Sequence, residues 1–231
     1  MGFIKRRFAN PTHLRLPPSP WWITAIMVLL FGKFLFPGNV SVIIDWVERV
    51  LIIFGLISIG ERIVWQAPLR RVPLTGRQWA VVVLLSVLVF VVFEFIFVVV
   101  WPYLPHWPNF GYGIITVDVI FWLDMTLGLV LVAVSEEWVF RQLAHRRGAL
   151  LGHSPARIVF ESSAAFALIH LPKGVSAVAI TFLFGLIAMM LYRRTGSFFL
   201  LVLIHYFVNL ASFSGATTWF VERVVGFDLP Y

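Results

Sequence analysis

Runs of about 20 mostly apolar residues, separated by short polar loops, limit what this chain can fold into. Of its 231 residues, 60% are hydrophobic and only 13% are charged, whereas a soluble domain carries about 25% charged residues. A helix of about 20 apolar residues is long enough to span a bilayer. The sequence therefore predicts an all-α, polytopic integral membrane protein whose chemistry takes place within the membrane.

The hydrophobic runs predict about seven transmembrane helices. They cover residues 21–36, 40–60, 78–101, 114–141, 156–171, 175–192 and 197–212. Small residues in the sixth segment, among them Gly185, indicate close helix packing. The segment at 213–231 is too short and too polar for an eighth span, and we expect an interfacial helix there at most.

Charge in the loops indicates the topology. Basic residues gather in alternate loops, at 1–20, 61–77, 142–157 and 193–196. By the positive-inside rule this pattern places the N-terminus in the cytoplasm. We expect the membrane to be a prokaryotic plasma membrane. The net charge of +7 is then explained by the basic loops that set the topology, and we expect no nucleic-acid partner.

Three regions follow from this reading. They are a basic cytoplasmic tail at 1–20, a transmembrane helical domain at 21–213 with its motif core at 114–213, and a short C-terminal tail at 214–231. The chain contains no cysteine, which excludes disulfides, thiolate catalysis and cysteine metal sites.

Two adjacent acids, Glu136 and Glu137, close the apolar run of the fourth segment. In a helix, Glu137 and Arg141 lie on one face and can pair. Glu136 is turned about 100° away, so helical geometry does not commit it to that pair. Because an ionisable side chain near hydrocarbon depth is costly, it indicates a functional site. We expect Arg141 to hold Glu137 and Glu136 to be available for chemistry.

Two later segments carry residues that suit a hydrolytic site. Phe166 and His170 are four residues apart on one helix, and His205 and Asn209 are four apart on another. A carboxylate in apolar surroundings, here Glu136, can act as a general base, and a neutral histidine can relay its proton. A second histidine and an amide can stabilise an oxyanion. The set predicts hydrolysis of an amide by an activated water.

A zinc site is the alternative for the same residues. Glu136, His170 and His205 could be three ligands, with water as the fourth. The chain has no H-E-x-x-H motif, and the residue four after His205 is Asn209, a poor zinc ligand. We therefore favour metal-free water activation and keep Zn²⁺ as an alternative cofactor.

Two other classes of function compete with an enzyme. Four further acids lie inside predicted spans and are interpreted as structural groups or as a proton path: Glu94, Asp118, Asp124 and Glu161. A proton path would fit a proton-coupled transporter or permease. A non-catalytic immunity or scaffold protein of the same fold would use the site as a binding pocket.

The three motifs together resemble the CPBP intramembrane proteases, also called the CAAX-protease or bacteriocin-processing (Abi) family. Its E-E-x-x-x-R motif matches Glu136, Glu137 and Arg141, its F-x-x-x-H motif matches Phe166 and His170, and its H-x-x-x-N motif matches His205 and Asn209. The resemblance covers about 136–209. It implies helices around an intramembrane catalytic cavity.

The resemblance also implies roles for these residues. Glu136 would activate water with His170 as its partner, and His205 and Asn209 would stabilise the oxyanion. Glu137, Arg141 and Phe166 would support them. The family includes the endopeptidase that removes the last three residues of prenylated proteins, so the implied partners are the bilayer and a peptide or protein substrate, lipidated or of another maturation type. Both metal-dependent and glutamate-type mechanisms have been described for the family.

Overall fold

The computed structural model describes residues 32–36, 38–64, 75–81 and 115–226, with the isolated residues 84, 95, 99 and 103. The predictions for the tail at 1–20, for most of the first segment, for the span at 78–101 with Glu94 and for the loop at 102–113 lie almost entirely outside these residues.

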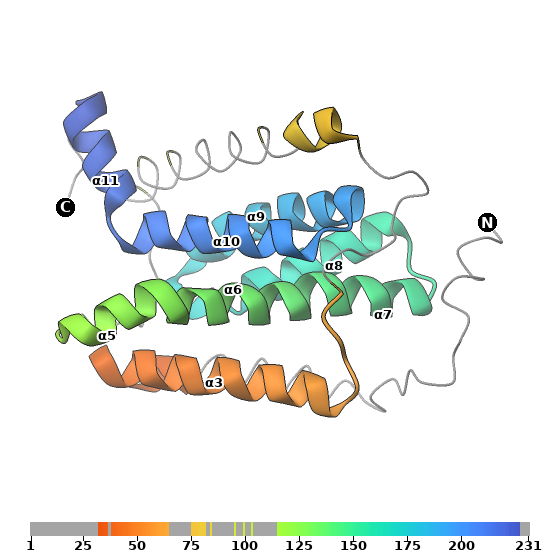
Figure 1. The fold of residues 1–231 in the computed structure, drawn as a ribbon, viewed down its shortest axis with the longest axis horizontal. Helices are drawn as coiled ribbons and strands as arrows, with labels where there is room; N and C mark the ends of the chain where they lie inside the picture. The colour runs from red at the N-terminus through yellow and green to blue at the C-terminus, as the bar shows by residue number, and fades with distance from the viewer. Residues whose placement is uncertain are drawn as a thin grey trace.

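The described residues form helices of three kinds, and no strand occurs among them (Figure 1). The labelled α-helices are α3 (Gly38–Ser58), α5 (Asp118–Leu123), α6 (Leu129–Glu137), α7 (Ala144–Leu150), α8 (Pro155–Leu168), α9 (Val175–Thr195), α10 (Phe198–Phe213) and α11 (Ala216–Phe220), and residues 76–81 are helical as well. Short 3₁₀ turns are η2 (Lys33–Leu35) and η6 (Leu171–Lys173). Three π-helical turns are η4 (Asp124–Gly128), η5 (Trp138–Leu143) and η7 (Val221–Val225).

One continuous helical segment carries the two acids of the first motif. The elements α5, η4, α6, η5 and α7 join into Asp118–Leu150, a candidate membrane span of 33 residues. The span thus continues beyond Arg141, as far as Leu150. A π turn lies on each side of α6, and such turns inside long helices occur often at functional sites.

The number of spans is decided only in part. Among the described residues, Asp118–Leu150 and Val175–Thr195 are long and apolar enough to cross a membrane, and α10 with the C-terminal Ala216–Val225 makes a third if the pair, bent by 65°, counts as one. The helical membrane fold is therefore supported, and the count of seven stays a prediction.

Local signals explain where the later helices begin and end. Ser154 caps α8 by accepting a hydrogen bond from the backbone N–H of Arg157, and a proline follows it, as helix starts prefer. Ser197 caps α10 in the same way. Gly196, with φ of 68°, ends α9 in the left-handed conformation. These boundaries lie within three residues of the predicted segments 156–171, 175–192 and 197–212.

Helix α6 lies at the centre of the described fold, between α3 and α10 (Figure 1). Helices α8 and α9 pack along each other. The chain after α3 is attached to the long span by Gln142, whose amide donates to the Arg62 carbonyl at 2.5 Å and accepts from the Val64 N–H at 2.8 Å. The core joining these helices includes Trp138, Phe140, Phe166, Met189 and Tyr192.

Gly185 permits the close approach of α9 to α8. A Cβ added at this position would lie 3.0 Å from both Cα and Cβ of Ser163. We expect Gly185→Ala to lower the free energy of unfolding by about 1–3 kcal/mol, the usual cost of overpacking, measured by thermal unfolding in nanodiscs. Gly55→Ala is the matched control, because its Cβ would meet no described atom within 4 Å. Equal stability of the two variants would contradict this account of the α8–α9 contact.

Candidate active site

A cavity of about 320 Å³ lies between α3, the long span, the α8–α9 connection and α10. Four of the residues predicted from the sequence line it: Glu136, His170, His205 and Asn209. They come from three separate parts of the chain. The fold therefore brings the residues of the three motifs to one cavity. Most of the remaining wall is apolar, with Val42, Phe121, Met125, Leu129 and Phe213 among its residues.

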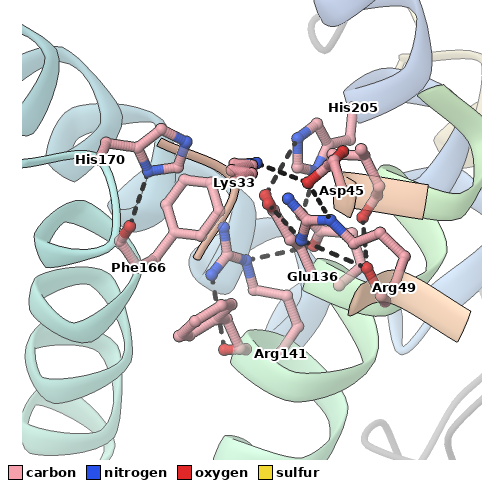
Figure 2. Close-up of polar contacts among 12 residues, drawn as sticks. Lys33, Asp45, Arg49, Glu136, Arg141, Phe166, His170 and His205 are labelled. Atoms are coloured by element: carbon pink, nitrogen blue, oxygen red, sulfur yellow. Dashed lines mark hydrogen bonds and ion pairs between the residues drawn. The ribbon is translucent and has the colours of Figure 1, made fainter. Parts of the chain in front are cut away.

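The Glu136 carboxylate is buried, with its side chain 3% exposed. Its Oε1 lies 2.7 Å from Nη1 of Arg49, and its Oε2 lies 3.6 Å from Nε2 of His205 (Figure 2). Oε2 accepts no hydrogen bond from the described residues. The prediction that Glu136 lies outside the Glu137–Arg141 pair is met, but the carboxylate is not left unpaired. It has a cationic partner of its own, on α3.

Glu137 connects the first motif to the third. Its Oε2 lies 3.2 Å from Nε of Arg141, and its Oε1 accepts a hydrogen bond of 2.8 Å from Nδ1 of His205. The side chains of Glu137 and Arg141 are both fully buried. The predicted pair with Arg141 is therefore present, and Glu137 also fixes the orientation of the His205 imidazole.

His170 lies just beyond the end of α8. Its Nδ1 is 2.9 Å from the carbonyl oxygen of Phe166. Because a carbonyl can only accept, Nδ1 carries the proton, and Nε2 of the neutral ring is the acceptor. The Phe166 ring packs against His170, with ring centroids 4.9 Å apart, and lies under the Arg141 guanidinium at 4.6 Å. Phe166 thus packs against both His170 and Arg141.

Three charged residues that the motif analysis missed form a connected group at the site. Lys33, Asp45 and Arg49 all line the cavity. Nζ of Lys33 lies 2.6 Å from Oδ1 of Asp45, and Nε of Arg49 lies 3.1 Å from the same oxygen. The signal that could have found them is the i,i+4 spacing of Asp45 and Arg49 inside an otherwise apolar segment.

The other acids within predicted spans differ in their surroundings. Asp124 lines the cavity and accepts a hydrogen bond of 2.7 Å from the Trp46 indole. Glu161 lies on the outside of α8, where it pairs with Arg157 and His153. Both acids thus have polar partners in the described fold, and their structural role stays a prediction.

The residues of the cavity do not form a metal site as they are arranged. Among the described residues, no three histidine, aspartate or glutamate side chains are grouped so that they could hold one ion. In addition, the Arg49 guanidinium contacts Oε1 of Glu136, where it would compete with a metal ion for that carboxylate.

Comparison with known proteins agrees with the motifs. Residues 118–211 match the model of one family, described as type II CAAX prenyl endopeptidase Rce1-like. The match covers less than half of the chain, and this part of it is similar to that family. The match begins at the first residue of α5 and ends within α10, so it contains Glu136, His170, His205 and Asn209.

The similarity to the Rce1-like family indicates a general function. The family is one of CAAX-type proteases, which are hydrolases that act on peptide or protein substrates in membranes. The apolar helices of the chain agree with an integral membrane protein of this kind. No curated protein and no solved structure matches the chain.

Proposed function

We propose that the chain is an intramembrane endopeptidase that hydrolyses a peptide bond of a membrane-associated substrate, prenylated or of another maturation type. The observation that carries the proposal is the single cavity lined by Glu136, His170, His205 and Asn209. Its apolar wall suits a lipid chain or apolar side chains of a substrate. The catalytic machinery would then lie within the region 114–213.

In the proposed reaction, Glu136 is the general base. Its Oε2 takes a proton from a water molecule, and the water oxygen attacks the carbonyl carbon of the scissile bond. Nε2 of His170 accepts a hydrogen bond from the same water, because the Nδ1–H of His170 donates to the carbonyl oxygen of Phe166 and leaves Nε2 as the acceptor. This pair orients the water as well as activating it.

His205 and Asn209 stabilise the oxyanion that forms on the carbonyl oxygen. For this His205 must carry a proton on Nε2, while its Nδ1 donates to Glu137. The C–N bond then breaks as the proton held by Glu136 passes to the leaving nitrogen. Arg141 and Glu137 keep His205 in place and do not take part in the proton transfers.

Cleavage of a defined reporter tests this function. We expect the purified chain in nanodiscs to cleave a quenched fluorescent peptide that carries a prenylated cysteine followed by three C-terminal residues. The same peptide without the prenyl group should be cleaved at least about tenfold more slowly, since burial of apolar carbons stabilises the complex by about 0.8 kcal/mol per CH₂. Equal rates on the two peptides would contradict lipid recognition. No cleavage of either by the folded protein would contradict an endopeptidase of the prenyl-directed type.

A further inference from the structure

The closest charged partner of the proposed base comes from outside the family match. Arg49 lies on α3, and its Nη1 contacts Oε1 of Glu136 at 2.7 Å (Figure 2). Its side chain is 2% exposed. Residues 118–211, which match the family, contain Glu136 but not Arg49.

The other edge of the Arg49 guanidinium is bound as well. Its Nε contacts Oδ1 of Asp45, and the same oxygen is contacted by Nζ of Lys33. Cation and anion therefore alternate from Lys33 through Asp45 and Arg49 to Glu136. With both edges of the planar guanidinium engaged, the group has little freedom to rotate.

Fold stability alone is a poor explanation for such a row of charges. Taking charges out of water costs several kcal/mol per ion, and a buried ion pair is often no more stabilising than apolar side chains of the same volume. The row ends on the one carboxylate that the proposed reaction uses, and it lines the cavity. This location favours a role in the reaction.

The contact fixes the proposed base in one orientation. Because Oε1 is bound to Arg49, rotation of the carboxylate is restricted, and Oε2 is the oxygen left without a hydrogen bond. That is the oxygen the proposed mechanism needs for water. We propose that Arg49, anchored by Asp45, is a positioning residue that holds Glu136 for catalysis. The inference rests on the proposed function and extends the active site to α3.

The test separates kcat from KM for the prenylated reporter. We expect Arg49→Gln in the full chain to lower kcat about 10²-fold, the effect of a small misplacement of a catalytic group, with KM changed less than about threefold. Arg49→Lys keeps the charge but loses the planar two-edged contact, so its kcat should lie between those of Arg49→Gln and wild type. If Arg49→Gln does not fold, the kcat of Arg49→Lys alone tests the inference. Reduced kcat at unchanged KM supports the inference, and wild-type kcat overturns it.

Arg146→Gln is the matched control. Arg146 pairs with Glu61, so this pair joins the same two parts of the chain as the Arg49–Glu136 pair does, but Arg146 does not line the cavity. We expect kcat within about threefold of wild type. An equal loss of kcat in Arg146→Gln and Arg49→Gln would overturn the positioning role, because helix attachment would then explain both. Wild-type protein that cleaves nothing overturns the proposed function together with this inference, whereas full activity in Arg49→Gln overturns the inference alone.

Discussion

Replacement of Glu136 by glutamine is expected to lower kcat on the prenylated reporter by about 10²–10⁴-fold, the range that general bases contribute. Glutamine has nearly the same size and keeps an oxygen for Arg49, but it cannot take a proton from water. The loss should therefore appear in single-turnover rates while substrate binding is kept.

Glu161→Gln is the control for this experiment. Glu161 lies on the outside of α8, with its side chain 46% exposed, and does not line the cavity. We expect its kcat to equal that of wild type. Turnover by Glu136→Gln within about tenfold of wild type would show that another group activates the water.

The second large effect is expected at Arg141. Arg141→Met should lower the free energy of unfolding by about 3–5 kcal/mol, because it leaves the buried carboxylate of Glu137 without its cation. Methionine retains part of the packing against Phe166, so the loss is mainly electrostatic. Cleavage should fall as well, since Glu137 orients His205. The change in the free energy of unfolding is measured by titration of the protein with a denaturing detergent in mixed micelles.

The chain offers a matched pair on its surface. Arg157 and Glu161 are also four residues apart on a helix, and their side chains are 58% and 46% exposed. Exposed pairs contribute about 0–1 kcal/mol, so Arg157→Met should change stability little. If the two methionine variants were equally destabilised, burial would not explain the importance of Arg141.

The Glu137–Arg141 pair could be predicted from the sequence because helical spacing alone brings the two side chains together. The gathering of His170 and His205 with Glu136 could be expected only from the motifs, since spacing within one helix says nothing about which helices are neighbours. The family match supports the motif assignment at the level of the family. The roles of the individual residues stay proposals.

The Arg49–Glu136 contact could not be predicted in this way. It joins α3 to the long span, and neither residue has a local signal for the other. The link from His205 to Glu137 is similar, because the motif analysis associated His205 with Asn209 on its own helix. Contacts between helices depend on packing, which depends on the shapes of many apolar side chains at once.

The π turn at Trp138–Leu143 is a place where the long span can differ in length by one residue. An i→i+5 turn takes in one residue more than a turn of α-helix. Deletion of one residue there would restore a regular turn and leave the residues beyond it facing the same way, whereas deletion of one residue from a regular α-helical stretch such as α6 would rotate everything beyond it by about 100°. The π turn should therefore tolerate the loss of one residue better than α6 does, and a homologue one residue shorter here would keep α7 in the same orientation.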